Sequence, residues 1–320
     1  MKYSIKPVLA LVAILLLLNP VFAEKNRIVV AQDGTGMFRT VAEAIRSVPD
    51  NSSTGIVIFI KNGVYKEKLD IPKSKVNITM IGEDVDKTII TFDDYASKKD
   101  ASGKNIGTSG STSVYVRCDS FTAENITFEN ASGPVGQAVA LSVGGDKVVF
   151  RNCRFLGFQD TIYTFGNTAR QYFYKCYIEG TVDFIFGAAT ALFEKCEIFC
   201  KRSGYITAAS TPEGQKFGYV FLNCKISGNA SEKSFYLGRP WRPNAQVVFI
   251  KCELPALIKP EGWHNWGKES NEQTAFYAEY KNRGAGSQPQ NRVSWSRQLT
   301  KEEAAAYTKK NMFGDWDPGS

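Results

Sequence analysis

Histidine is almost absent from this sequence, since His264 is the single histidine among 320 residues. Zinc sites combine histidine with cysteine or carboxylate ligands at characteristic spacings, and the cysteine spacings here fit none of them. The sequence also lacks a Gly-x-Ser-x-Gly stretch, so a Ser-His-Asp esterase is poorly supported, and a structural role is the better interpretation of His264. No cluster of acidic residues suggests calcium. We therefore predict a site that uses neither a metal nor another cofactor.

Basic blocks with interleaved aromatic residues are missing too, which argues against nucleic acid as a partner. Long apolar runs are confined to the start of the chain, where Lys2 and Lys6 precede an apolar run over 8–18 and small residues follow. This pattern predicts a signal peptide over 1–23. We expect the remaining chain, 24–320, to form one domain that is secreted to the cell exterior, the cell wall or the periplasm, without membrane contact after cleavage.

The charge balance is modestly basic. Removing residues 1–23 takes away two lysines and no acid, which leaves 37 − 32 = +5 from the 39 basic and 32 acidic residues of the whole chain. A basic exported protein suits an acidic partner such as a polyanionic polysaccharide. A merely solvated surface explains the same balance equally well.

Cysteine is present in an odd number, seven, so at least one thiol has no partner within the chain. Five cysteines share one local pattern, and Ile126 takes the cysteine position in a sixth copy. The copies are FTAENITF (121–128), VVFRNCRF (148–155), YFYKCYI (172–178), ALFEKCEI (191–198), YVFLNCKI (219–226) and VVFIKCEL (247–254). Their spacings of 27, 23, 20, 28 and 28 residues, with one short apolar strand per copy, are typical of a solenoid.

The repeat predicts an all-β fold, a parallel β-helix in which each copy forms one coil. Because side chains alternate along a strand, the repeated cysteine and the apolar residue two places later should both point inward. The inward pairs are Cys153 with Phe155, Cys176 with Ile178, Cys196 with Ile198, Cys224 with Ile226, and Cys252 with Leu254. Cys200 lies outside this pattern, and whether it pairs with a neighbouring cysteine stays open.

A solenoid needs caps at its ends. A capping-box pattern from Thr40 to Glu43 predicts a short helix that ends before Pro49 and plugs the N-terminal end. A second capping box at 300–303 predicts a helix that continues to about Asn311. The segments 94–113 and 256–300 are expected to be long loops on the flank.

Four short stretches stand outside the repeat, and each follows one of its strands. They are GQAVAL (136–141), GFQDT (157–161), GTVDF (180–184) and YLGRPW (236–241). Stacked coils lie about 4.8 Å apart, so these stretches should meet on one face of the solenoid.

Two carboxylates, two amides and a guanidinium would meet there. Asp160 and Asp183, on successive coils, could divide acid and nucleophile roles, because close like charges push their pKa values apart. Arg239 could pair with Asp183, while Gln137 and Gln159 could donate to an oxyanion. The alternative is that each only satisfies backbone groups at a turn.

These motifs resemble those of the pectin methylesterases of the pectinesterase family. The resemblance runs from about Ile28 to Trp316 and includes GVYKE (63–67) and GWHNW (262–266). It implies a right-handed, single-stranded parallel β-helix. It also implies an enzyme that removes methyl esters from the galacturonate units of pectin and releases methanol. The expected partner is methyl-esterified homogalacturonan, bound by a monomer.

The resemblance also implies a role for each matching residue. Asp183 matches the nucleophile, and Asp160 matches the general acid that protonates methanol and then activates water. Gln137 and Gln159 match the amides that stabilise the tetrahedral intermediate, and Arg239 matches the group that orients the nucleophile and contacts substrate.

The expected substrate contacts are aromatic, apart from Thr108. Trp241 matches a platform under the sugar, Phe158 stands where the family often has tyrosine, and Phe184 follows the nucleophile. A galacturonan hydrolase or a lyase is not supported, because their characteristic motifs are missing. A polysaccharide-binding β-helix without catalysis, which uses the aromatic residues for stacking alone, is the remaining alternative.

Overall fold

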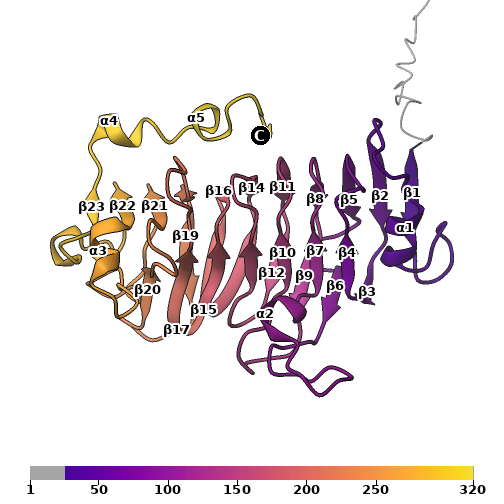
Figure 1. Cartoon of the computed structure of the whole chain (residues 1–320), viewed down its shortest axis with the longest axis horizontal. Helices are drawn as coiled ribbons and strands as arrows, with labels where there is room; N and C mark the ends of the chain where they lie inside the picture. Colours follow the sequence, from indigo (N-terminus) through magenta and orange to yellow (C-terminus); the bar gives the residue numbers. More distant parts are fainter. Residues whose placement is uncertain (1–25, 320) are drawn as a thin grey trace, which may run out of the picture.

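The computed structural model describes residues 26–319, which form a parallel β-helix capped and flanked by short helices (Figure 1). The fold expected from the repeat is confirmed. The predicted signal peptide lies outside the described residues. Within 26–319, no helix has the length and apolarity to cross a bilayer.

One side of the coil is an eleven-stranded parallel sheet, in which consecutive coils are neighbours. Its strands are β1 (Arg27–Val30), β2 (Ile56–Ile60), β5 (Ile78–Gly82), β8 (Thr122–Glu124), β11 (Val148–Arg151), β14 (Arg170–Tyr174), β16 (Thr190–Glu194), β18 (Tyr219–Leu222), β21 (Gln246–Ile250), β22 (Phe276–Tyr280) and β23 (Arg297–Gln298).

A twelve-stranded sheet forms the rest of the coil and bends into two columns of strands. The first column holds β3 (Gly63–Lys66), β6 (Thr88–Phe92), β9 (Thr127–Asn130), β12 (Arg154–Leu156) and β19 (Lys225–Gly228). The second column holds β4 (Leu69–Ile71), β7 (Val114–Val116), β10 (Leu141–Val143), β13 (Ile162–Thr164) and β20 (Phe235–Gly238). Two longer strands, β15 (Tyr177–Gly187) and β17 (Glu197–Ala209), pass through both columns.

Stacked identical side chains fill the core, because every coil has the same register as the next. A phenylalanine row joins the rings of Phe150, Phe173, Phe193, Phe221 and Phe249, whose successive centroids lie 4.9, 4.6, 4.6 and 4.3 Å apart. Beside it the repeated cysteines and the apolar residues two places later are all buried, as predicted. All seven cysteines, which lie within the described residues, are free, so Cys200 forms no disulfide.

The N-terminal helix α1 (Val41–Ser47) begins and ends as its sequence indicates. The Thr40 hydroxyl accepts from the Glu43 N–H at 3.2 Å, which satisfies one of the free donors of the first turn. Val41, Ala44 and Ile45 are buried against the first coils, so the helix caps the solenoid core.

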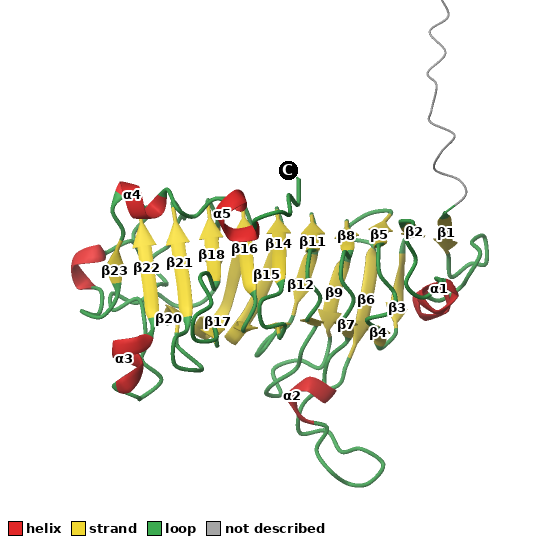
Figure 2. Ribbon diagram, turned by 45° about the horizontal axis from the view of Figure 1, so that its top comes forward, coloured by secondary structure: helices red, strands yellow, loops and turns green. Residues whose placement is uncertain are grey.

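The C-terminal helix is shorter than predicted. The capping box at Thr300 opens α4 (Lys301–Ala304), but the chain leaves the helix there. Thr308 then caps a separate helix, α5 (Lys309–Phe313), by accepting from the Asn311 N–H at 3.2 Å. This segment runs back along the outer face of the eleven-stranded sheet instead of covering its end (Figures 1 and 2). Met312 and Phe313 are buried there against Tyr172 and Leu192.

The flanking segments match the expectation only in part. The segment 94–113 is a projecting loop with one short helix, α2 (Gly107–Gly110) (Figure 2). The segment 256–300 was expected to be loop, which is wrong: it adds β22 and β23 to the sheet. It also holds α3 (Ser270–Thr274) and a 3-10 helix over Pro289–Asn291. These strands were not predicted because they lack the repeated cysteine by which the other coils were identified.

Candidate active site

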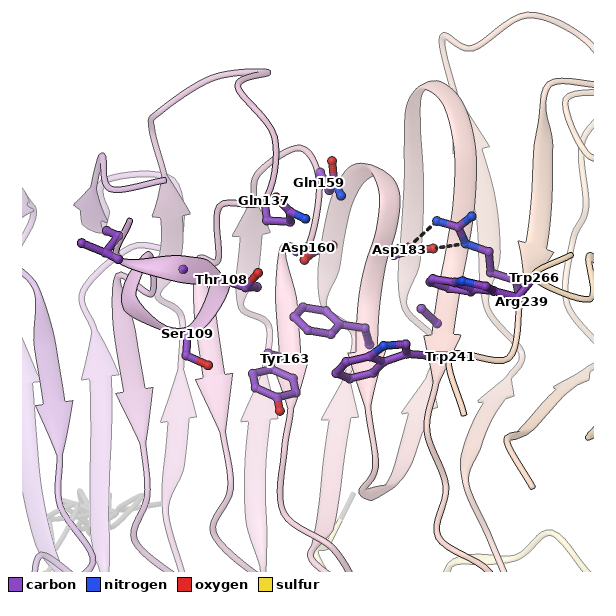
Figure 3. A pocket seen from close by; sticks show the side chains of 14 residues that line it. Thr108, Ser109, Gln137, Gln159, Asp160, Tyr163, Asp183, Arg239, Trp241 and Trp266 are labelled. Atoms are coloured by element: carbon purple, nitrogen blue, oxygen red, sulfur yellow. Dashed lines mark hydrogen bonds and ion pairs between the residues drawn. The ribbon is translucent and has the colours of Figure 1, made fainter. Parts of the chain in front are cut away.

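The predicted site residues meet where the first column passes into the second, a turn that we call the site corner. Gln137 precedes β10, Asp160 precedes β13, and Asp183 lies in β15 between its two halves. Gln137 and Gln159 are bridge partners on adjacent coils. Arg239 directly follows β20. That strand pairs with β17, which in turn pairs with β15, the strand that carries Asp183. Four stretches that are distant in the sequence are thus brought side by side (Figure 3).

All five side chains line one cavity of about 600 Å³. Its lining residues are Ile106, Gly107, Thr108, Ser109, Gln137, Gln159, Asp160, Tyr163, Asp183, Phe186, Ala208, Arg239, Trp241 and Trp266.

Asp183 is buried, and its charge has a dedicated partner. Only 6% of the residue is exposed. Arg239 donates to both carboxylate oxygens, from Nε to Oδ1 at 2.9 Å and from Nη2 to Oδ2 at 2.7 Å. A two-point pair of this kind fixes the orientation of a carboxylate as well as balancing its charge. The pairing expected from the sequence is therefore present.

The guanidinium of Arg239 is itself held between two aromatic rings. Its central carbon lies 3.9 Å from the ring centroid of Tyr205 and 3.8 Å from that of Trp266. Both distances are well within the range of a cation–π contact. Figure 3 shows the Trp266 ring beside Arg239. Sequence reasoning included Trp266 as part of the GWHNW stretch and missed Tyr205 altogether.

Asp160 differs from Asp183 in having no partner. Its residue is 8% exposed, and within residues 26–319 its carboxyl makes no hydrogen bond or ion pair. Burial raises the pKa of the Asp160 carboxyl well above its ordinary value, and the charge of Asp183 raises it further, while Arg239 acts in the opposite direction. A neutral, protonated carboxyl is the form that this environment favours.

The pKa of Asp183 is also raised above its ordinary value, because burial outweighs the opposing effect of Arg239. The sequence interpretation anticipated the guanidinium but not the cost of burial. The pKa of Asp160 is the more strongly raised of the two. The pair is therefore arranged so that Asp183 ionises first and Asp160 keeps its proton to higher pH.

Both carboxylates sit on left-handed backbone, with φ of +66° at Asp160 and +53° at Asp183. Residues other than glycine seldom adopt this conformation, although aspartate tolerates it better than most. Near Asp183 the pairing of β15 with β17 shifts register on both sides of Val182. This irregularity interrupts the strand alternation and turns the Asp183 carboxylate toward the cavity.

The two glutamine amides are free to bind a ligand. Gln137 is exposed and Gln159 half-buried, and neither side-chain amide makes a hydrogen bond within the described part of the chain. Figure 3 shows both beside Asp160. They are neutral donors near the carboxylates, which suits stabilisation of an oxyanion.

Thr108 reaches the cavity from the projecting loop, and hydrogen bonds tie the loop to the site strand. Ser111 donates to the Thr108 carbonyl at 2.6 Å and accepts from the Val139 N–H at 3.1 Å. The Ala96 N–H donates to the Gln137 carbonyl at 2.8 Å. The loop therefore positions Thr108 and the Gln137 backbone together.

Aromatic rings form one wall of the cavity. Tyr163 and Phe186 are register partners, and their rings stack with centroids 4.5 Å apart. Trp241 meets both rings edge-on. Sequence reasoning identified Trp241 and missed the other two, although each directly follows a core isoleucine, Ile162 or Ile185, so strand alternation would have turned them outward.

Phe184, expected to contact substrate, is instead a core residue. It is fully buried and packs edge-on against Phe235, with ring centroids 6.3 Å apart. Because Asp183 is left-handed, the residue after it turns inward. A Cβ at position 180 would overlap the Phe184 side chain and the Phe158 carbonyl, which explains the glycine at the start of this motif.

Phe158 lies beside the main cavity rather than in it. It lines a neighbouring pocket of about 220 Å³ together with Arg202, and Gln159 forms part of the wall of both. The Lys201 ammonium lies 3.6 Å from the centroid of the Phe158 ring.

His264 is outside the cavity lining, and its Nδ1 accepts from the Trp266 N–H at 3.0 Å. It thereby supports the loop that carries Trp266. Among residues 26–319, no group of three or more His, Cys, Asp or Glu side chains is placed to hold a metal ion.

The chain is similar to known proteins over most of its length. A family model described as Pectinesterase matches residues 27–315. Pectinesterase 31 of Arabidopsis thaliana is 45% identical over 284 residues, which are 87% of this chain and 89% of that protein. The chain spans about half the length of other relatives, such as a Brassica napus protein named probable pectinesterase/pectinesterase inhibitor, of which it covers 50%.

Solved structures agree. The pectin methylesterase from carrot has a TM-score of 0.81 and 37% identity, with 89% of this chain and 92% of that chain covered. A pectin methylesterase crystallised in complex with a hexasaccharide has a TM-score of 0.78 and 33% identity, with 92% of this chain and 98% of that chain covered.

Proposed function

Because the chain belongs to the pectinesterase family and is a carboxylic ester hydrolase that removes methyl esters from pectin, we propose that Asp183 is its nucleophile and Asp160 its general acid and base. One observation carries this assignment. Two buried carboxyls line the same cavity, one paired through two hydrogen bonds with Arg239 and the other without a partner. Their environments therefore differ in the way that a nucleophile and an acid require.

In the first step an ionised Asp183 oxygen attacks the carbonyl carbon of the galacturonate methyl ester. A tetrahedral intermediate forms and collapses with cleavage of the bond to the methoxy oxygen. Asp160 gives its proton to that oxygen, so methanol leaves as a neutral molecule. The galacturonyl group is then joined to Asp183 as an acid anhydride.

In the second step Asp160, now ionised, takes a proton from a water molecule as the water attacks the galacturonyl carbonyl. The bond to Asp183 breaks, which releases the product as a neutral galacturonic acid carboxyl group. Asp183 returns to its ionised form and Asp160 to its protonated form. The proton balance closes with one methanol and one carboxylic acid per ester, and the acid ionises in solution.

Negative charge develops on the ester carbonyl oxygen in both tetrahedral intermediates. Gln137 and Gln159 have unoccupied amide groups at the site corner, and donors fixed in advance stabilise such charge more than water does. Arg239 keeps the attacking carboxylate in one orientation. Tyr163, Phe186 and Trp241 provide apolar faces for the sugar rings, and Thr108 a hydroxyl.

Two further properties belong to the proposal. The predicted signal peptide supports export, so we place the mature chain in the cell wall, the extracellular space or the periplasm. One chain supplies both carboxyls, both amides and the guanidinium that the proposed chemistry needs, so we propose action as a monomer on methyl-esterified homogalacturonan.

The rival reading is a β-helix that binds pectin without cleaving its esters. It leaves the unpartnered, buried Asp160 without a purpose. The test is to incubate the purified chain with highly methylated pectin and to measure methanol and released acid together. Equal molar amounts of both are expected, whereas binding without either product would overturn the proposal.

A further inference from the structure

A second feature of the coil lies outside the cavity, at the turn that follows the eleven-stranded sheet. Seven successive coils turn there through one left-handed residue, with φ between +47° and +55°. These residues are Asn125, Asn152, Lys175, Lys195, Asn223, Lys251 and Lys281. Backbone hydrogen bonds of 2.8–3.2 Å join each of the first six to the next coil, so the seven form a straight row along the solenoid. We call its four lysines the lysine row.

Conformational preference does not account for lysine at these positions. Among residues with a side chain, asparagine and aspartate enter the left-handed region most readily, because their short polar groups bond locally. Three coils use asparagine, and the Asn152 side-chain amide donates to the side-chain oxygen of Asn125 on the preceding coil at 2.7 Å. Four coils have lysine instead, and within the described residues these lysine side chains make no hydrogen bond. Lysine at these four positions presents a cation to solvent.

The four ammonium groups are available to a partner. Lys175, Lys195, Lys251 and Lys281 are all exposed, and within the described residues none takes part in an ion pair. Many other lysines of the chain do, among them Lys66, Lys68 and Lys201.

The acidic side chains beside the row already have other partners. Glu194 accepts from the Tyr172 hydroxyl at 2.6 Å and lies 3.4 Å from Lys309. Glu253 lies 3.4 Å from Arg283. The row therefore keeps its positive charge.

We infer that the lysine row is a second binding surface for pectin, specific for stretches that have already lost their methyl esters. Such a stretch carries one carboxylate on each sugar. Successive coils of the row lie about 4.8 Å apart, a spacing comparable with one sugar ring, and all of them from Lys175 to Lys281 except that of Asn223 present a cation. From Lys175 to Lys281 the row extends about 19 Å. Tyr174 and Tyr280 lie beside it, each with a row lysine within 5.4 Å of its ring centroid. An aromatic ring next to a cation suits a sugar acid, because the ring can stack on the sugar while the cation pairs with its carboxylate.

The surface is separate from the catalytic cavity. It lies at the arrowhead ends of β14, β16, β21 and β22 (Figure 1), whereas the site corner follows one first-column strand later in each coil. The inference rests on the proposed function for the identity of the polysaccharide. Its role would be to retain the enzyme on the de-esterified product while the cavity acts on neighbouring esters.

The test measures binding to fully de-esterified polygalacturonate, which has no ester to hydrolyse. Lys251→Asn removes one charge and suits the left-handed backbone. Lys147→Asn is the control for the backbone position, since Lys147 is also left-handed (φ +58°) but lies at the opposite turn of the coil, where it pairs with Asp315 at 3.5 Å. At low ionic strength we expect Lys251→Asn to weaken binding roughly two- to fivefold, the size of an exposed ion pair, and Lys147→Asn to have less effect. Equal losses in both variants would show that only net charge matters and would overturn the inference.

The gap in the row permits a gain-of-binding test. Asn223 lies between Lys195 and Lys251 on the intervening coil, so Asn223→Lys completes five consecutive cations. We expect it to tighten binding roughly two- to fivefold and to steepen the salt dependence, whereas no gain would contradict the inference.

Two further measurements distinguish a pectin-binding surface from a part of the catalytic site and from a general polyanion-binding surface. The four-lysine variant with asparagine at 175, 195, 251 and 281 should keep wild-type turnover on highly methylated, nearly uncharged pectin. A parallel loss of that turnover would place the row within the catalytic machinery instead. Binding of single-stranded DNA as tight as that of polygalacturonate would show a general polyanion surface and would overturn the specificity for pectin.

Discussion

The turn after the eleven-stranded sheet and the site corner both pass through left-handed residues, but they differ in what repeats. At the first turn, seven coils place asparagine or lysine at the left-handed position, and in six of them a buried cysteine or isoleucine follows. At the site corner, left-handed aspartate occurs on two coils of the described chain, at Asp160 and Asp183. The residues that form the fold therefore recur on many coils, whereas the residues assigned to catalysis occur on only a few.

The two regions also differ in their contribution to stability. The stacked phenylalanine and cysteine rows bury apolar side chains on every coil. The site corner buries two carboxyls, one of them without a partner. Substitutions should therefore separate the regions: at the site corner turnover falls while the fold persists, and in the stacked core the reverse holds.

The largest effect on turnover is expected from Asp183→Asn. The amide has the same shape but cannot attack an ester, so kcat should fall a thousandfold or more. Methanol release measures this, and an unchanged circular dichroism spectrum controls for folding. Retention of a tenth of wild-type turnover, with deamidation excluded, would rule out covalent catalysis by Asp183.

Asp160→Asn should lower kcat by about a hundredfold to ten-thousandfold, because a general acid and base is lost. In the wild type, kcat/KM should rise as Asp183 ionises and fall at higher pH as Asp160 loses its proton, since both pKa values are raised and that of Asp160 more strongly. The descending limb should be missing from the residual activity of the variant. If that limb persists unchanged, it belongs to another group.

The same variant should be more stable than the wild type at neutral pH. The raised pKa means that native Asp160 holds a proton which the unfolded chain releases. Stability from this group is thus complete below the ordinary pKa of 3.8 and is lost as pH rises through the folded value. Thermal unfolding across this range checks it, and a lower Tm for Asp160→Asn at neutral pH would contradict it.

Arg239→Lys should reduce kcat on the order of a hundredfold, with a smaller change in KM. Lysine keeps the charge but lacks the planar fork that holds both oxygens of Asp183 and stacks between Tyr205 and Trp266. A slightly misplaced nucleophile is enough for such a loss. Kinetics on pectins of low and high methylation provide the check. A defect confined to KM that varies with substrate charge would mean that Arg239 only attracts the polyanion.

Phe193→Ala tests the other side of the comparison. Phe193 is fully buried between Phe173 and Phe221. Its loss should lower the free energy of unfolding by about 3–5 kcal/mol. Denaturant unfolding measures this, and kcat per folded molecule should stay near wild type at low temperature. A large fall in kcat of the folded fraction would show that the core rows tune the site.

The smallest expected effect is that of a strong chelator, which should leave turnover unchanged. The proposed chemistry uses carboxylates, amides and a guanidinium. Loss of methanol release in chelator, restored by added calcium or zinc, would refute a mechanism without metal.

The sequence predicted what repeats and what matches a motif. The cysteine spacing revealed the coils, and the four short stretches that follow repeat strands identified Asp160, Asp183 and Arg239 as neighbours. It could not reveal β22 and β23, because those coils lack the cysteine. Nor could it place Phe184, because one left-handed residue reverses the alternation on which such an assignment depends. The contact of Tyr205 with Arg239 could not be predicted, because only the stacking of coils brings the two residues together.

The central claim is that the two buried carboxyls rest in different states, with Asp160 protonated and Asp183 ionised. Infrared difference spectroscopy on the free enzyme, at a pH within the active range, tests it directly. A protonated carboxyl band is expected in the wild type and in Asp183→Asn, and its loss is expected in Asp160→Asn. A band that disappears in Asp183→Asn but remains in Asp160→Asn would reverse the roles and contradict the account.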